Sequence, residues 1–158
     1  MIGDELPDDA HVVRYVKPTW ISDADGSIDG EAFRLKQDES GLSVNWLEWF
    51  GNCTKAQQLN EVRRLVRLEM RKSGCLAELN AGVTKQHVLK HTALNFIHKP
   101  LPAECNYEAD PSHSEIAGLP PRDNLQAAML GDMIAECVEN AHPTAEQVNG
   151  ETIGLQEE

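Results

Sequence analysis

The sequence has few aromatic residues, no long apolar run and no closely spaced cysteines. Aromatic side chains make up 5% of the 158 residues, so we expect a core built mainly from aliphatic groups. Every apolar run is far shorter than the roughly 20 residues that cross a bilayer, and we expect no membrane contact. The chain begins with acidic residues and has no apolar stretch of the signal-peptide type there, which favours a cytoplasmic protein.

The spacing of the cysteines and histidines gives no sign of a metal or redox site. The four cysteines stand far apart and contain no C-x-x-C pair: Cys53, Cys75, Cys105 and Cys137. This argues against a zinc knuckle and a redox dithiol, and free thiols are expected in a cytoplasmic protein. His87 and His91 have the i, i+4 spacing of a helical metal site, but the H-E-x-x-H signature is missing. The sequence therefore predicts no metal and no cofactor.

Basic residues are scarce and unevenly placed. The net charge is −12, yet residues 51–102 hold nine bases against three acids, between two acidic flanks. Two interpretations stay open: the acidic ends fold back over the basic middle or keep the protein soluble, or the basic middle binds an anionic partner. The overall charge disfavours binding to nucleic acid, which is itself a dense polyanion.

Hydrophobic periodicity indicates one α+β domain over residues 10–142, between acidic ends (1–9 and 143–158) that we expect to be disordered. Strands are predicted over residues 11–16, 31–36, 42–49, 75–79 and 94–98, with the second and third joined as a hairpin. Helices are predicted over residues 54–73, 84–91 and 123–140. Thr54 and Gln57 have the spacing of a capping box. The expected architecture is a mainly antiparallel sheet of four to five strands, packed on one face by two main helices.

Residues 98–120 contain several prolines and favour a defined loop rather than an interior helix or a central strand. The segment includes Asp110-Pro111-Ser112-His113. In one interpretation Asp110 or Ser112 caps a turn and His113 bonds locally to hold the loop in place. In the other, the loop carries catalytic groups.

Four residues are the candidates for catalysis: His98, His113, His11 and Arg14. Two histidines can serve as general acid and base at neutral pH, and an arginine can hold a phosphate. His11 and Arg14 are three residues apart in a predicted strand, so they should point to opposite faces of the sheet. This weakens them as members of one site.

Three arginines are the candidates for binding an anion or a partner: Arg64, Arg67 and Arg71. Their i, i+3, i+7 spacing in the predicted helix would form one ridge of guanidinium groups. The alternative is a solvated face paired with Glu61, Glu69 and the acidic C-terminal region.

Four phrases of the sequence, HVVRYVKP, EAFRLKQDESGLSVNWLEWF, HKPLP and DPSHSEIAGLP, resemble a group of small bacterial proteins that have no assigned activity. The resemblance implies a bacterial origin and one compact domain, and supplies no catalytic residue. We expect a small protein that acts through macromolecular contacts with a protein partner, as an accessory or regulatory component of a defence or toxin–antitoxin type system. The alternative is a phosphoester- or nucleotide-processing enzyme that uses the paired histidines and an arginine.

Overall fold

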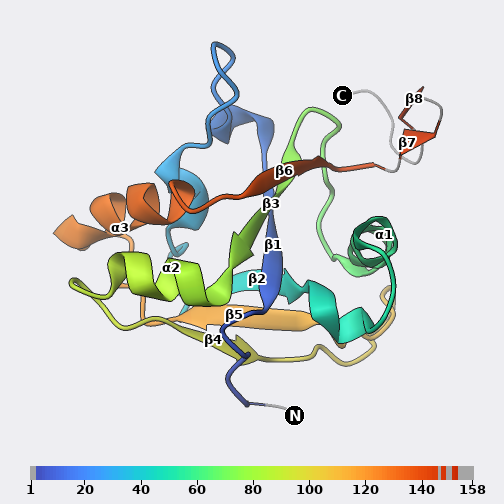
Figure 1. Ribbon diagram of the computed structural model, residues 1–158, viewed down its shortest axis with the longest axis horizontal. Coiled ribbons are helices and arrows are strands. Elements are labelled where there is room, and N and C mark those ends of the chain that lie inside the picture. Colours follow the sequence, from blue (N-terminus) through green and yellow to red (C-terminus); the bar gives the residue numbers. More distant parts are fainter. Residues whose placement is uncertain (1–2, 146, 149–150, 153–158) are drawn as a thin grey trace.

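A computed structural model describes residues 3–145, 147–148 and 151–152 of the chain. Within these residues, six antiparallel strands form one open sheet that is flanked by three α-helices (Figure 1). The strands of the sheet are β1 (His11–Val16), β2 (Leu42–Trp46), β3 (Cys75–Asn80), β4 (Asn95–His98), β5 (His113–Ala117) and β6 (Asn140–Pro143). The α-helices are α1 (Lys55–Leu65), α2 (Ala81–Val88) and α3 (Leu125–Ala135). Short elements are the 3-10 helices η1 (Pro18–Trp20), η2 (Gly30–Phe33) and η3 (Leu47–Phe50), and a ribbon of β7 (Gln147–Val148) with β8 (Glu151–Thr152).

Strand β1 lies in the interior of the sheet, whose order is β4-β5-β2-β1-β3-β6. It pairs with β3 along all six of its residues. With β2 it pairs only at Val12 and Val13, which stand opposite Trp46 and Asn45. Beyond Val13 the ladder between β1 and β2 is interrupted.

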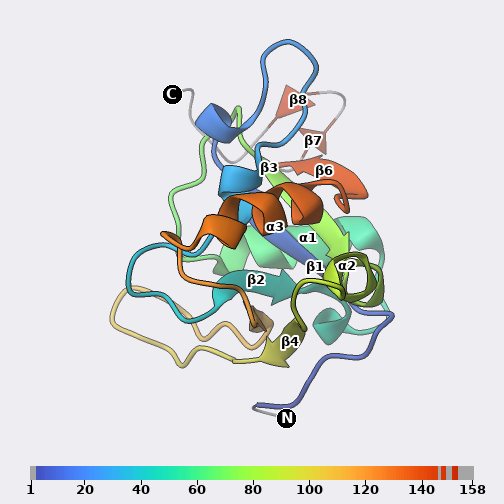
Figure 2. The same cartoon turned by 90° about the vertical axis from the view of Figure 1, so that its left-hand side faces the viewer.

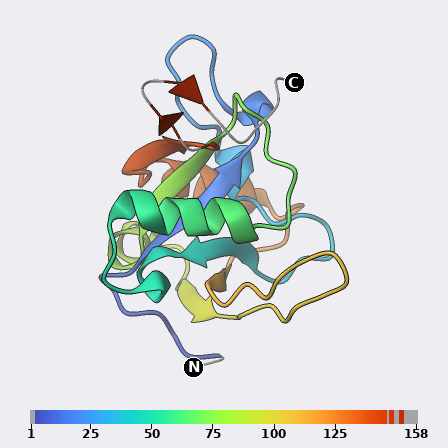
Figure 3. The same ribbon diagram turned by 90° about the vertical axis from the view of Figure 1, so that its right-hand side faces the viewer.

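Helices cover both faces of the sheet, with α2 and α3 on one face and α1 on the other (Figures 2 and 3). Val12 of β1 belongs to the larger core, together with Phe33 of η2 and Ile134 of α3. Val13 belongs to the smaller core, together with Val62 of α1. A strand buried on both faces needs apolar residues at consecutive positions, which explains the Val12-Val13 pair.

The α+β class and the antiparallel sheet are confirmed, but the predicted number of strands is too low. The described residues contain six strands in the sheet rather than four to five, and three helices, which are the two main ones and the short one predicted near residues 84–91. The prediction that the two main helices share one face is also wrong, because α1 and α3 lie on opposite faces. The sequence pattern identifies an apolar face of each helix, but it does not say which side of the sheet that face meets.

Two strands are missing from the prediction. Residues 98–120 were expected to form a loop, but His113–Ala117 form β5, which lies inside the sheet between β4 and β2. The prolines of this segment stand outside the paired residues, so they interrupt no ladder. The helix predicted over residues 123–140 ends at Ala135, and the chain then enters β6.

The predicted strand over residues 31–36 is wrong, because this segment contains the 3-10 helix η2. The Asp29 side chain accepts a hydrogen bond from the backbone N of Glu31 (2.8 Å) and so caps a helical turn. The turn buries Ala32 and Phe33 against the larger core. The predicted hairpin between residues 31–36 and 42–49 is therefore absent from this part of the described chain.

Helix α1 has the predicted capping box but ends earlier than expected. The Thr54 side chain accepts from the backbone N of Gln57, and the Gln57 side chain accepts from the backbone N of Thr54. Val66 then takes an extended conformation, so the helix ends at Leu65 rather than at residue 73. Arg67 and Arg71 consequently lie outside α1, and the predicted arginine ridge does not form.

The N-terminal segment, for which the composition predicts disorder, contacts the sheet in its described part. In the described residues 3–9, Leu6 is buried and its backbone N donates to Phe96 O of β4 (2.7 Å). The backbone N of His98 donates to Asp4 O (2.9 Å), so the segment runs along the edge of β4. At the other end, Thr144 is buried and its hydroxyl donates to Arg71 O (2.9 Å). Most of the tail predicted to be disordered (residues 143–158) lies outside the described residues.

A buried polar network holds the start of β5 in place. The Asn45 side-chain NH2 of β2 donates to Asp110 Oδ2 (2.8 Å) and to Ser112 Oγ (2.9 Å). The Ser112 hydroxyl in turn donates to Asp110 Oδ1 (2.8 Å). All three side chains are buried, and buried polar groups are costly unless they are bonded in this way. The turn-capping interpretation of Asp110 and Ser112 describes this geometry.

Helix α3 and η2 meet through two glycines. A Cβ on Gly131 would lie far inside van der Waals contact with Gly30 O, and a Cβ on Gly30 would overlap the backbone of Asp132. The close approach allows α3 to cover the larger core directly beside Phe33. No side chain can be accommodated between these two elements without moving the helix.

We predict that Gly131→Ala destabilises the protein by about 1–3 kcal/mol, because the added methyl overpacks the contact with Gly30. Helix propensity alone predicts the opposite, a gain of about 1 kcal/mol from replacing an interior glycine with alanine. Urea unfolding, monitored by circular dichroism, distinguishes the destabilisation expected from overpacking from the gain expected from helix propensity. A variant that is more stable than the parent protein would contradict the close contact.

We also predict that Asn45→Ala lowers the free energy of unfolding by about 1–3 kcal/mol, because Asp110 and Ser112 lose a buried donor. Ser43→Ala, on an exposed position of the same strand, should change it by no more than about 0.5 kcal/mol. Equal stability of the two variants would show that the network does not hold β5.

Candidate functional site

The two histidines that were expected to work as a pair lie on opposite faces of the sheet. His98 of β4 stands opposite Ser114 in the ladder, and neighbouring residues of a strand point to opposite faces. His113 therefore projects to the face of α1, whereas His98 projects to the face of the larger core. The geometry excludes a site that uses both rings.

His98 has a structural environment. Its ring is 3% exposed and packs between Trp46 and Trp49, with ring centroids 5.5 and 5.0 Å away. Its Nε2 donates to Pro111 O (2.7 Å), which ties β4 to the loop that precedes β5. A buried ring with these partners has a structural role, because it holds the loop against β4.

His113 is more exposed and lies beside a hydroxyl group. Its Nδ1 donates to Lys99 O (2.8 Å), which leaves Nε2 as the acceptor of the neutral ring. That nitrogen is 3.2 Å from Ser43 Oγ of β2. The His113 ring therefore lies between the Ser43 hydroxyl and the Lys99 carbonyl, and the bond from Nδ1 to Lys99 O fixes the orientation of the ring.

Arg14 occupies the place where β1 and β2 stop pairing. Its Nε donates to Ala32 O (2.6 Å) and its Nη1 donates to Ser43 O (2.8 Å), an oxygen that an intact ladder would pair with β1. Burial lowers the pKa of Arg14 to about 10, while the charge of Glu39 opposes this shift. The guanidinium therefore stays cationic at neutral pH, inside a partly closed space.

Arg14 and His113 line the same pocket, which we call the basic pocket. It has a volume of about 520 Å³. Its lining comes from β1 and the following η1, the segment around η2, β2, the residues after α1, the loop before β5, the start of β5, and the segment before α3. Its basic lining residues are Arg14, Lys17, Arg34, Lys36, Arg67 and Arg122, and its acidic lining residues are Glu31, Glu39, Glu69 and Asp110. Tyr15, Trp20 and Leu68 add aromatic and apolar surface.

Several of the acidic groups in the basic pocket are already bound to the protein. Glu31 is shared between Arg34 (3.2 Å) and Arg122, and Asp110 belongs to the buried network with Asn45. Within the described part of the chain, no carboxylate forms an ion pair with Arg14, Lys17 or Lys36. Lys17 Nζ instead lies over the Trp20 ring, 4.4 Å from its centroid. The pocket thus carries an excess of positive charge in a protein whose net charge is −12.

Arg67 is the member of the predicted arginine ridge that reaches the basic pocket. Its guanidinium donates to Pro102 O (2.5 Å) and Glu108 O (2.9 Å), and its Cζ lies 5.3 Å from the centroid of the Tyr107 ring. These contacts hold the loop between β4 and β5 in place. Its Nε is buried and has no hydrogen-bond partner among the described residues. A buried donor of this kind is costly, and it leaves hydrogen-bonding capacity in the wall of the pocket.

Arg64 and Arg71 lie outside the basic pocket. Arg64 forms ion pairs with Glu61 (2.8 Å) and with Glu108, which is the paired surface that the sequence offered as the alternative. The backbone N of Arg71 donates to the Tyr15 hydroxyl (2.9 Å), and its carbonyl accepts from Thr144. The two residues are therefore not brought together with Arg67 as one binding surface.

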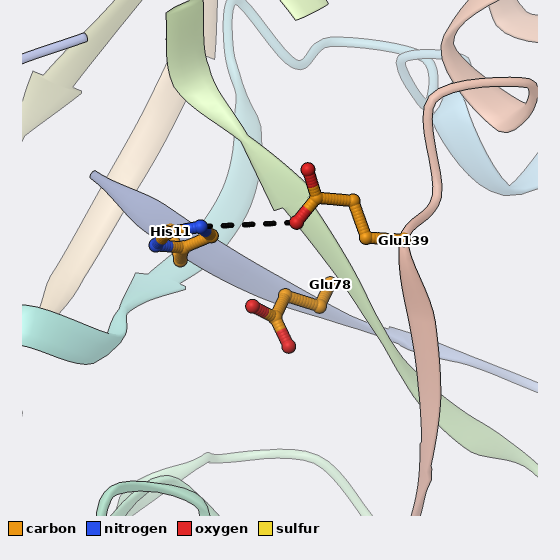
Figure 4. Close-up of side chains that lie close together, drawn as sticks. All are labelled: His11, Glu78 and Glu139. Carbon is orange, nitrogen blue, oxygen red and sulfur yellow. Dashed lines mark ion pairs between the residues drawn. The ribbon is translucent and has the colours of Figure 1, made fainter. Parts of the chain in front are cut away.

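His11 lies at the opposite end of β1, away from the basic pocket, among acidic side chains (Figure 4). Its Nδ1 donates to Glu48 Oε2 (2.7 Å), and its Nε2 is 3.7 Å from Glu139 Oε1. Nearby Glu78 is 1% exposed and accepts from Lys55 Nζ (2.5 Å) and His142 Nε2 (2.7 Å). Burial acts to raise the pKa of Glu78, but the bonds from Lys55 and His142 outweigh it and hold the pKa below its ordinary value.

Sequence reasoning did not identify most of the residues that form these two places. Lys17, Lys36 and Arg122 come from separate segments and carry no shared motif. Glu48 and Glu139 likewise stand alone in the sequence. These residues are recognised only because they lie close together in the folded chain. The basic stretch over residues 51–102 contains just one basic residue of the pocket, Arg67.

No helix among the described residues has both the length and the apolar character needed to cross a bilayer. Comparisons with protein-family models, curated proteins and solved structures found no match.

Proposed function

We propose that the protein acts by binding an acidic segment of a protein partner in the basic pocket. The observation that carries the proposal is the excess of cationic side chains in one concave site of a strongly acidic protein. Arg14, Lys17 and Lys36 form no ion pair with a carboxylate in the described chain, and the exposed ammonium groups of Lys17 and Lys36 are available to the carboxylates of a ligand. Desolvated guanidinium groups are effective binders of carboxylates.

The shape and the lining of the pocket favour a peptide over a nucleic acid. The net charge of −12 repels a long polyanion, whereas a short acidic segment can enter the pocket and avoid most of the acidic surface. Trp20, Tyr15 and Leu68 also offer contacts to the apolar side chains of a peptide. The occupant that fits both features is an acidic segment with some apolar residues.

We further propose that this binding takes place in the cytoplasm of a bacterium, where the protein is an accessory or regulatory component of a defence or toxin–antitoxin type system. The support is the resemblance of the phrases HVVRYVKP and DPSHSEIAGLP to small bacterial proteins. The basic pocket supports the binding step, and the resemblance supports the setting.

The first test of this function is the binding of a hexaglutamate peptide, measured by isothermal titration calorimetry. Binding should weaken as the salt concentration rises, because the contacts are electrostatic. Lys36→Glu should raise the Kd about tenfold, which corresponds to about 1.4 kcal/mol. Lys90→Glu is the matched control, because it changes the net charge equally at an exposed position outside the pocket, and it should leave the Kd unchanged. Equal effects of the two variants would contradict a role for the pocket.

A second candidate function is hydrolysis of a phosphoester, and one observation favours it. Ser43 Oγ is 3.2 Å from His113 Nε2, His113 Nδ1 is held by Lys99 O, and Arg14 stands beside Ser43. A hydroxyl beside an oriented imidazole is the arrangement of an activated nucleophile. In this candidate His113 accepts the Ser43 proton and Arg14 holds the phosphate, without any role for His98.

The two candidates are separated by the turnover of p-nitrophenyl phosphate. If the protein only binds its partner, the parent protein and His113→Gln release p-nitrophenol at the same background rate. If the protein is an enzyme, His113→Gln and Ser43→Ala should each lower the rate roughly 10²–10⁴-fold while the folding stability is preserved. We expect the first result, and the second would replace the binding function with the enzymatic one.

A further inference from the structure

A second group of polar side chains gathers at the start of β1 and contributes nothing to the basic pocket. His11, Glu78 and Glu139 each offer one donor atom, and the three donor atoms lie within 4.8 Å of one another (Figure 4). The residues come from β1, from β3 and from the turn that leads into β6, so the sheet fixes their backbones. The turn is anchored as well, because the backbone N of Glu139 donates to Glu78 O (2.9 Å).

Glu48 sets the orientation of the His11 ring. One oxygen of its carboxylate accepts from the His11 backbone N (2.7 Å), and the other accepts from Nδ1 (2.7 Å). With the proton on Nδ1, the lone pair of Nε2 faces the carboxylates of Glu139 and Glu78. A lone pair that faces two carboxylates is repelled by them unless a proton or a metal cation stands between the groups. A carboxylate behind a histidine is also the usual partner of a metal-binding imidazole.

The charges of the group match a divalent cation. Glu48, Glu78 and Glu139 contribute three negative charges, and Lys55 contributes one positive charge through its bond to Glu78. The three carboxylates exceed the one ammonium group by two negative charges, the histidines left aside. The bond from His142 also holds the Glu78 carboxylate in place (2.7 Å).

We propose that His11, Glu78 and Glu139 bind a divalent transition-metal ion of the Mn²⁺ or Zn²⁺ class. One imidazole and two carboxylates are the donors that such ions accept, whereas soft ions prefer thiolates, and no cysteine belongs to the group. Bonds of about 2.1 Å would bring the donors to about 3 Å apart. Rotation of the Glu139 side chain, which is 39% exposed, can provide that movement.

The test is the binding of Mn²⁺ to the full chain, followed by electron paramagnetic resonance. Mn²⁺ is the suitable probe because it avoids thiols, and the chain has four free cysteines. We expect one equivalent of Mn²⁺ to bind and the signal of free Mn²⁺ to fall accordingly. Glu139→Gln should weaken the binding at least tenfold, and His11→Gln should do the same.

The control is Glu136→Gln, which changes an exposed carboxylate that pairs with His87 (2.8 Å) outside the group. It should bind Mn²⁺ as the parent protein does. Glu139 is exposed, so its substitution tests the site without disturbing the core, whereas substitution of buried Glu78 would combine both effects. Absence of Mn²⁺ binding, or equal binding in Glu139→Gln and Glu136→Gln, would overturn the proposal and leave His11 as a protonated ion-pair partner of the glutamates.

Discussion

The interruption between β1 and β2 is the feature from which the proposed binding site follows. The two strands pair at Val12 and Val13 only, and the Arg14 guanidinium then binds Ser43 O and Ala32 O in place of the ladder. The charged side chain satisfies backbone groups that would otherwise lack partners, and the strands can separate at little cost. The separation forms the floor of the basic pocket. The same cation is thus a structural element and a charge of the site.

Helix α1 connects the two polar regions of the molecule. It lies across one face of the sheet, over the smaller core (Figure 3). Lys55, its first residue, reaches Glu78 in the proposed metal site, and the segment that follows its last residue contributes Arg67 to the basic pocket. Both regions therefore lie near the two ends of α1. Packing under the helix holds both sets of side chains on one rigid body.

The sequence predicts the parts of the fold in which local pattern and tertiary structure agree. The capping box at Thr54 and the apolar pattern of β1 and β3 belong to this class, since each depends on neighbouring residues only. Strand β5 is different: its HSEIA sequence follows several prolines, and its place inside the sheet comes from the ladders with β2 and β4. Of the candidate catalytic residues, Arg14 and His113 share a pocket, while His98 is turned away by the two-residue period of its strand. The pocket itself combines residues from segments far apart in the sequence, between Val13 and Arg122, and no local pattern contains that information.

The three tryptophans offer the most direct test of the binding account. Trp20 lines the basic pocket, whereas Trp46 and Trp49 pack around His98. The measurement is a titration of ¹⁵N-labelled protein with hexaglutamate, observed through the three indole N–H signals in a two-dimensional NMR spectrum. The account predicts that the Trp20 signal shifts with saturation while the other two stay in place. Shifts confined to Trp46 and Trp49, or no shift of Trp20 at saturating peptide, would contradict it.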